Sequence, residues 1–183
     1  MWIMYWGGDK MSTIFLAGIY GVGKSTLAER ISATTGLPCF SAGDLISRVN
    51  GEKYGANKFV TDKEKNQDIL AECVSEILQT TKTIILAGHF CIVNRQGEVD
   101  KLPNHVFTKL QISKIVLLEA SPSIIMEHLS GRDGKNYSLE LLKDLLLQER
   151  ECAKTVSALL QCPLIIHQMR YTDEDIEVLQ HEL

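Results

Sequence analysis

The residue types best suited to chemistry stand between positions 18 and 25, where the chain reads Gly-Ile-Tyr-Gly-Val-Gly-Lys-Ser. They fit every fixed position of the phosphate-loop pattern G-x-x-x-x-G-K-[ST]. Glycines allow positive φ angles, and consecutive backbone N–H groups can then turn inward to form a nest for phosphate oxygens. Lys24 supplies a cation for the β- and γ-phosphates, while the hydroxyl of Ser25 is a ligand for the Mg²⁺ that bridges them. This stretch predicts a binding site for ATP with Mg²⁺.

The flanking residues favour this function over a glycine-rich surface turn that fits the pattern by coincidence. An apolar run at residues 14–17 is typical of a buried strand, and Leu27, Ala28 and Ile31 recur at helical spacing behind the loop. A helix that begins at Lys24 directs the positive end of its dipole at the same anion. The residues expected to contact the nucleotide are Gly18, Tyr20, Gly21, Val22, Gly23, Lys24, Ser25 and Thr26.

The composition is that of a single globular domain. The 183 residues are 45% apolar and 23% charged, and a formal net charge of −4 disfavours nucleic acid as a partner. No apolar run approaches the roughly 18 residues that a membrane span requires. Five scattered cysteines without a C-x-x-C spacing are typical of reduced thiols in a cytoplasmic protein. We therefore expect a cytoplasmic domain over residues 11–183, with residues 1–10 as an N-terminal extension.

Apolar runs that alternate with amphipathic segments predict an α/β fold. The run at residues 83–87 is apolar on both faces, as expected for a strand that is buried in a parallel sheet, and residues 114–120 predict another buried strand. Strands that alternate with helices imply three layers, in which a parallel sheet with right-handed crossovers lies between two layers of helices.

The connections and the long helix complete this pattern. Residues 51–62 are polar and predict a loop, and the chain is expected to fold back on itself at Gln96-Gly97, ahead of a short helix near residues 106–110. A polar segment at residues 131–137 separates a helix that ends near residue 129 from a long helix at about 138–160. A buried strand end and this long helix account for the charged residues Glu119, Glu149 and Arg150 without a function.

Two stretches resemble the nucleoside monophosphate kinases of the adenylate kinase type. The sequence GIYGVGKSTLAERISATTGLPCFSAGDLISR is similar to the loop, first helix, second strand and Gly-Asp turn of that family, archaeal cytidylate kinases included. The segment IILAGHFCIVNRQGEVDKLP, followed by KIVLLEASPSIIMEHL, resembles archaeal-type adenylate kinases. The resemblance implies a P-loop NTPase fold with a parallel five-stranded sheet in the order 2-3-1-4-5. It also implies an acceptor-binding lobe at about residues 44–79 and a short lid at about residues 131–137.

The resemblance and the expected sheet edge together suggest roles for four residues outside the loop. Asp44 would hold water ligands of Mg²⁺ or bind the acceptor; alternatively, it caps the next helix. Arg48 and His89 would bind the acceptor, and the alternatives are a solvated charge on a helix and a packed histidine. Arg132 would stabilise the transferring phosphoryl group from the lid, unless it is a surface charge. Catalysis is thereby assigned to Lys24, Asp44 and Arg132, and metal binding to Ser25 and Asp44.

The chain departs from the family pattern at two places. Ala87 stands where the third strand of the family usually ends in aspartate, and Arg132 is the one arginine in the lid sequence GRDGKNY. Two functions therefore stay open. The first is an ATP-dependent phosphotransferase that acts on a nucleoside monophosphate or a similar small acceptor. The second is a weakly hydrolytic or non-enzymatic ATP-binding module whose bound state is read by a partner protein.

Overall fold

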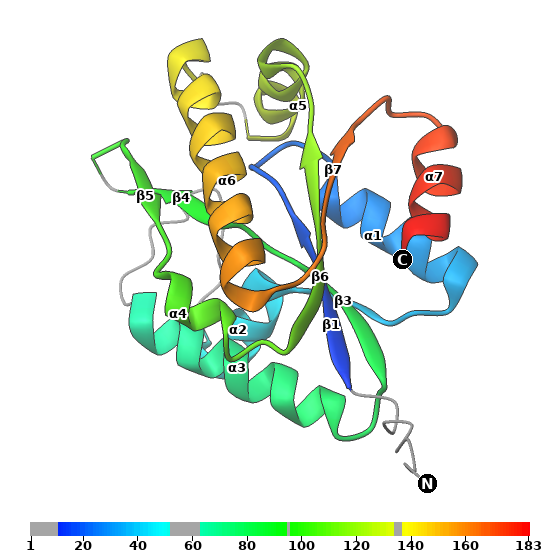
Figure 1. The fold of residues 1–183 in the computed structure, drawn as a ribbon. Coiled ribbons are helices and arrows are strands. Elements are labelled where there is room, and N and C mark those ends of the chain that lie inside the picture. Colours follow the sequence, from blue (N-terminus) through cyan, green and yellow to red (C-terminus); the bar gives the residue numbers. More distant parts are fainter. Residues whose placement is uncertain (1–10, 52–62, 95, 134–136) are drawn as a thin grey trace, which may run out of the picture.

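The centre of the fold is a parallel five-stranded sheet (Figure 1). The computed structural model describes residues 11–51, 63–94, 96–133 and 137–183. Its sheet strands are β1 (Ser12–Ala17), β2 (Cys39–Ser41), β3 (Thr83–Ala87), β6 (Ile112–Glu119) and β7 (Leu164–Gln168). They lie in the order β2-β3-β1-β6-β7, which is the predicted order 2-3-1-4-5 when the sheet strands are counted along the chain. The predicted α/β fold class is confirmed.

Helices on both faces of the sheet complete three layers, as Figure 1 shows. On one face, α1 (Lys24–Thr35) packs against β3 and beside α7 (Glu174–Glu182). On the other face, α6 (Leu139–Leu160) packs on β6 and beside α5 (Pro122–Asp133). The shorter connections contain α2 (Ala42–Asn50), α3 (Lys63–Leu78) and α4 (Asn104–Phe107). Across the described parts of the chain, no helix is both long and apolar enough to cross a membrane.

Strand β1 occupies the middle of the sheet because its side chains are apolar on both faces. Phe15 and Leu16 are 2% and 1% exposed, and β1 pairs in parallel with β3 on one side and with β6 on the other. Strand β2 pairs in parallel with β3, so that Ser41 lies beside Ala87 at the carboxyl end of both strands. Three strand ends therefore meet at one edge of the sheet, and the segments that follow them are brought together there.

The predicted hairpin is confirmed. Strands β4 (Cys91–Val93) and β5 (Val99–Lys101) pair antiparallel, and Gly97 takes a φ of 81° in the turn between them. The short helix that follows begins a little earlier than expected, at Asn104, because Pro103 occupies its N-cap in an extended conformation. The hairpin projects beside α6 in Figure 1.

Helix α5 continues four residues beyond its predicted end near residue 129 and finishes at Asp133. Gly131 does not stop it, because one glycine weakens a helix by only about 1 kcal/mol. The segment predicted as a lid, residues 131–137, therefore begins as the last turn of a helix. Residues 134–136 of that segment lie outside the described residues, as do residues 52–62 of the predicted loop and the N-terminal extension at residues 1–10.

Candidate functional site

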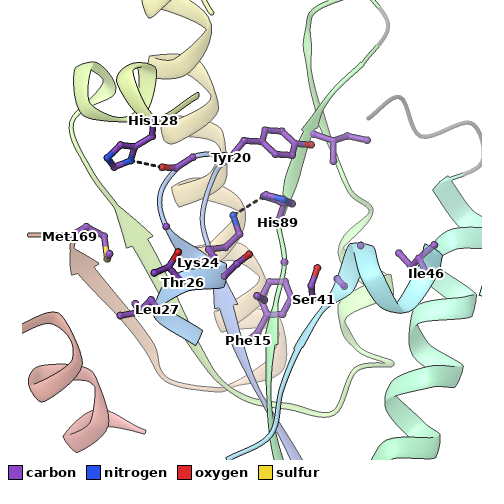
Figure 2. Close-up of a pocket in the computed structure, with 18 of the residues that line it drawn as sticks. Phe15, Tyr20, Lys24, Thr26, Leu27, Ser41, Ile46, His89, His128 and Met169 are labelled. Carbon is purple, nitrogen blue, oxygen red and sulfur yellow. Dashed lines mark hydrogen bonds between the residues drawn. The ribbon is translucent and has the colours of Figure 1, made fainter. Parts of the chain in front are cut away.

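A cavity of about 700 Å³ opens at the edge of the sheet where β1, β2 and β3 end (Figure 2). Its walls come from the start of α1, from the end of β2 and from α2, and from the segment after β3. Pockets for small molecules span roughly 300–1,000 Å³, and open parallel sheets bind their ligands outside the carboxyl ends of the strands. Both its size and its place mark this cavity as the candidate site.

The loop between β1 and α1 has the backbone that a phosphate nest requires. Gly18, Gly21 and Gly23 have φ angles of 147°, 77° and 98°. A Cβ atom at Gly18 would lie 2.8 Å from the carbonyl oxygen of Leu118, and one at Gly21 would lie 2.7 Å from Cγ of Leu129. A larger residue at either position would have to displace β6 or α5. Gly18, which is a fixed glycine of the pattern, and Gly21, which is not, are therefore required by the fold as well as by a ligand.

Most of the predicted nucleotide-binding residues reach the cavity. Those that line it are Tyr20, Gly21, Gly23, Lys24, Ser25 and Thr26. Gly18 and Val22 do not line it, and Val22 is fully buried. Ser25 and Thr26 are exposed in the first turn of α1, where a hydroxyl can approach a bound ion or phosphate.

Lys24 is anchored inside the loop through its ammonium group. The residue is 9% exposed, and Nζ donates to the carbonyl oxygens of Gly18 at 2.7 Å and Ile19 at 2.9 Å. Nδ1 of His89 lies 3.3 Å from the same nitrogen, and Figure 2 shows the two side chains pointing toward each other. The fold thus brings together two predicted site residues that are 65 positions apart.

His89 faces the loop with a defined ring orientation. Its Nδ1 atom lies 2.8 Å from the carbonyl oxygen of Gly18. We infer that Nδ1 carries the proton, because the carbonyl oxygen can only accept a hydrogen bond and is the nearer of its two partners. Nζ of Lys24, which can only donate, is then a close neighbour of Nδ1 at 3.3 Å rather than its donor. The ring also packs against that of Tyr20, with 4.3 Å between the two centroids. The histidine is therefore packed, as one alternative expected, and at the same time lines the cavity, as the other required.

Asp44 and Arg48 stand apart from the main cavity. Ser41 is the N-cap of α2, where its Oγ accepts the N–H of Asp44 at 3.3 Å, so the alternative that Asp44 caps this helix is wrong. Asp44 and Arg48 are exposed and line a second, smaller cavity of about 150 Å³, which Ser25 and Ala87 also line. Asp44 and Ser25 therefore border the same small cavity, as two residues that hold one ion should. Arg48 does not line the main cavity, where the acceptor was expected.

The opposite wall of the main cavity holds Arg132 together with two residues that the sequence analysis missed. Arg132 lies in the last turn of α5, exposed at the cavity. One helical turn earlier, His128 lies with Nδ1 3.0 Å from the carbonyl oxygen of Gly21 (Figure 2), and its ring packs edge-on against Tyr171 at 4.8 Å between centroids. The spacing of four between His128 and Arg132 is the sequence signal that places both on one helix face.

The loop that carries Tyr171 is shaped by the buried carboxylate of Asp175. Oδ1 and Oδ2 accept the backbone N–H groups of Arg170 at 3.1 Å, Tyr171 at 2.7 Å and Thr172 at 3.3 Å, and Oδ1 lies 2.8 Å from Nε2 of His167. Burial acts to raise the pKa of Asp175, but the hydrogen bonds from His167 and the loop outweigh it and hold the pKa below its usual value. The spacing Thr-x-x-Asp at residues 172–175 is typical of a capping box, and the carboxylate does reach back to the N–H of Thr172, although the N-cap of α7 is Asp173.

A second buried carboxylate, that of Glu149 in α6, lies behind the phosphate loop. The residue is 1% exposed, and burial raises its pKa from 4.5 to about 7 even though N–H donors and Lys24 lower it. The sequence analysis treated Glu149 as an ordinary helix residue. The overlooked signal is that Glu149 interrupts an apolar stripe, since it is buried together with its helical neighbours Leu142, Leu145, Cys152 and Val156. Its neighbour Arg150 pairs instead with Glu119, at the end of β6.

The described residues fit ATP with Mg²⁺. The glycine nest and Lys24 suit the phosphates, and the exposed hydroxyl of Ser25 suits the ion. Within the described ranges, no three His, Cys, Asp or Glu side chains are grouped to hold a metal ion by themselves.

Comparison with curated proteins finds kinases of low identity. An adenylate kinase from Thermoplasma volcanium is 26% identical over 113 residues, which cover 60% of this chain and 62% of the relative. An adenylate kinase from Streptococcus mutans is 27% identical over 128 residues, covering 65% and 59%. A shikimate kinase from Microcystis aeruginosa is 35% identical over 77 residues, covering 42% and 40%. The chain spans about three fifths of the length of the adenylate kinases that it matches.

Solved structures share the fold over nearly the whole chain. A shikimate kinase from Acinetobacter baumannii, in complex with shikimate, has a TM-score of 0.62 at 16% identity and covers 95% of this chain and 94% of its own. A gluconokinase from Sinorhizobium meliloti has a TM-score of 0.56 at 16% identity, with coverage of 93% and 94%. A family model described as the AAA domain matches residues 17–145, from the end of β1 into α6. The match covers more than half of the sequence. The chain has the fold of these kinase structures, and it belongs to the AAA-domain family.

Proposed function

We propose that the protein is an ATP-dependent kinase that phosphorylates a nucleoside monophosphate. One observation carries the proposal: the phosphate loop and Lys24 share a single cavity with His89 and with an apolar compartment. A triphosphate on the loop would place its terminal phosphoryl group beside Lys24, at the boundary of that compartment. Phosphoryl transfer needs mainly positioning and neutralisation of charge, which this arrangement can supply.

The walls of the compartment support a nucleobase as the group that enters it. Apolar side chains from several elements form these walls, among them Phe15, Ile46, Leu70, Ile92 and Phe107. The polar groups between them include the amides of Asn66 and Gln67, and Asn66 is 5% exposed with Oδ1 accepting from Asn50 at 3.1 Å. A flat aromatic base with amide-like edges suits such walls. A polyhydroxy acid such as shikimate or gluconate would need more hydrogen-bond partners for its hydroxyl and carboxylate groups.

The other site residues take distinct proposed roles. Arg132, exposed on the far wall of the cavity, would stabilise charge on the transferring group. Asp44 would hold water ligands of Mg²⁺ with Ser25, in the place of the aspartate that Ala87 replaces. Arg48 would bind the acceptor phosphate only if the acceptor extends toward the smaller cavity. His89, which presents its ring to the main cavity, would contact the acceptor directly.

A coupled assay of ADP formation tests the proposal. The full chain is supplied with ATP, Mg²⁺ and, one at a time, AMP, CMP, GMP, UMP, shikimate and gluconate. We expect ADP formation that depends on at least one nucleoside monophosphate and exceeds the background ATP hydrolysis at least tenfold. Turnover with shikimate or gluconate alone would replace the proposed acceptor by a polyhydroxy acid.

Ala87 favours a second candidate, the ATP-binding module with weak hydrolysis. At the end of β3 its methyl group offers no ligand to an ion, and the acids that line the smaller cavity are then Asp44 and Glu29, neither of which lies at the end of β3. The same assay separates the two functions. Tight binding of ATP without a response to any acceptor would support the module.

A further inference from the structure

The carboxylate of Glu149 bridges two segments that are far apart along the chain. Oε1 accepts the N–H of Gly18 at 3.2 Å and the N–H of Phe90 at 2.9 Å. Oε2 accepts the N–H of Phe90 at 3.0 Å and that of Cys91 at 2.8 Å. Gly18 opens the phosphate loop, whereas Phe90 and Cys91 lead from His89 into the hairpin. One side chain of α6 therefore holds both segments.

A second link between the same two segments closes a ring of hydrogen bonds. Nδ1–H of His89 donates to the carbonyl oxygen of Gly18 at 2.8 Å, and His89 directly precedes Phe90. Gly18 is thus held through its N–H by Glu149 and through its carbonyl by His89 and Lys24. Movement of the loop relative to His89 must break at least one side of this ring.

Packing alone does not account for a glutamate at this position. A leucine would continue the apolar stripe of α6, whereas a buried carboxylate carries a desolvation cost that only its hydrogen bonds offset. One of the three N–H groups that it accepts belongs to Gly18, whose backbone conformation is special, since it has a φ of 147° and no room for a Cβ atom. An acceptor aimed at this backbone fixes the conformation of the loop.

We propose that Glu149 is a positioning residue, which sets the phosphate loop and His89 relative to each other so that the phosphoryl donor and the acceptor are aligned. It acts through Gly18 and His89 rather than by touching a substrate. Only the kinetic part of the test below rests on the proposed kinase function. Misplacement of reacting groups by about 1 Å can lower a rate by about 10²-fold, which is the size of effect expected from losing the carboxylate.

Kinetics distinguish positioning from plain structural support. We expect Glu149→Gln to lower kcat with the accepted nucleoside monophosphate by about 10²-fold, while its dissociation constant for ADP changes less than fivefold. Glu149→Asp keeps the charge but is one methylene shorter, so it is expected to recover only part of kcat. Glu151→Gln is the matched control, because Glu151 is exposed on the same helix and pairs with Lys154. A folded Glu149→Gln variant with the kcat of the parent would overturn the proposal.

Amide NMR of the full chain tests the coupling without any assumption about the acceptor. Addition of ADP is expected to move the signals of Gly18, Phe90 and Cys91 together in the parent and in Glu151→Gln. In Glu149→Gln the response of Phe90 and Cys91 is expected to fall by at least half. An unchanged response in that variant would contradict the coupling, whether or not any nucleoside monophosphate is phosphorylated. Conversely, loss of coupling in a protein that phosphorylates no acceptor would refute the kinase function alone.

A pH titration of the parent keeps the proposal testable if Glu149→Gln does not fold. The amide signals of Gly18, Phe90 and Cys91 are expected to share one midpoint near pH 7, since all three donate to a carboxylate whose pKa is about 7. Separate midpoints, or none for Gly18, would overturn the proposal. The other titratable groups that face this carboxylate are Lys24, Tyr20, His89, Cys91 and Cys152. All of them are retained in Glu149→Asp, so a midpoint that shifts in this second variant depends on the carboxylate of residue 149.

Discussion

Two buried carboxylates flank the candidate site, and each gathers backbone N–H groups of a loop that borders the cavity. Asp175 holds the loop after β7 through three consecutive N–H groups and the ring of His167. Glu149 holds Gly18 in the phosphate loop and the two residues after His89. The first acid binds residues three to eight positions away, whereas the second joins segments that are 131 and 59 positions away.

The two acids also differ in what burial does to them. Burial prevails at Glu149 and raises its pKa to about 7, whereas hydrogen bonds prevail at Asp175 and hold its pKa low. Asp175, the local clamp, therefore stays charged at neutral pH, whereas Glu149, the long-range clamp, gains or loses its proton near pH 7. The difference indicates that Asp175 stabilises one loop, whereas Glu149 couples two parts of the site and does so in a manner that pH can change.

Removal of the local clamp is expected to have the largest effect on folding. Asp175→Ala leaves His167 and three part-buried N–H groups without their acceptor, and should lower the free energy of unfolding by about 3–5 kcal/mol. Urea unfolding measures this change. Asp173→Ala is the control, because Asp173 is exposed and pairs with Arg30 on the surface, where a pair contributes about 0–1 kcal/mol. A loss below about 1 kcal/mol at Asp175 would mean that the loop holds its shape without the acid.

Lysine at the phosphate loop should matter for binding more than for folding. We expect Lys24→Ala to weaken ATP binding by about 10²- to 10³-fold, or roughly 2.7–4.1 kcal/mol, because the ammonium is fixed where the phosphates would lie. Arg30→Ala, on the Asp175 side of the same cavity, should weaken binding less than tenfold, since Arg30 already pairs with exposed Asp173. Titration calorimetry on folded variants decides. Equal losses for both variants would erase the distinction between the two sides of the site.

The opposite pKa shifts predict opposite pH dependence of stability. Folded Glu149 holds its proton up to about pH 7, so the parent should lose stability relative to Glu149→Gln as pH rises from 4.5 to 7, by about 3 kcal/mol at most. Folded Asp175 releases its proton more readily than the unfolded chain does. The parent should therefore lose stability relative to Asp175→Asn as pH falls through the usual pKa of 3.8 and below. Urea unfolding from pH 3 to pH 8 measures both trends, and a shared direction would refute the contrast.

Periodicity and turn chemistry were sufficient for the fold and for the phosphate loop. Apolar runs such as residues 83–87 fix the buried strands, and the glycines before Lys24 leave few conformations open to the loop. Parallel strands then have to carry Lys24 and His89 to the same edge, which the structure bears out in a contact of 3.3 Å. The capping pattern at residues 172–175 also indicates the contact between Asp175 and the N–H of Thr172, because this contact spans only four residues.

Long-range partners are what these rules could not supply. Nothing near Glu149 in the sequence identifies Gly18 or Phe90 as its donors, and only its place on an apolar stripe marks it as unusual. The extent of α5 was misjudged for a different reason, since a glycine can stay helical when the flanking residues favour the helix. Which cavity Arg48 would face likewise depends on how α2 packs, and the sequence pattern does not encode that packing.

The last prediction concerns the ion, the part of the site that neither buried acid supports. Asp44 shares the smaller cavity with Ser25 and Ala87, and we expect Asp44→Ala to raise the Mg²⁺ concentration needed for half-maximal turnover by about 10- to 100-fold, or roughly 1.4–2.7 kcal/mol. The reason is that Ala87 leaves no second acid at the end of β3 to hold the water ligands of the ion. By the same argument, Ala87→Asp should lower the Mg²⁺ requirement and reduce the effect of losing Asp44 in the double variant. Asp144→Ala, at an exposed position of α6, should change neither quantity. Turnover measured against Mg²⁺ concentration decides between these outcomes. If Asp44→Ala leaves the requirement unchanged, the ion does not depend on Asp44, and the phosphate loop must hold MgATP without help from α2.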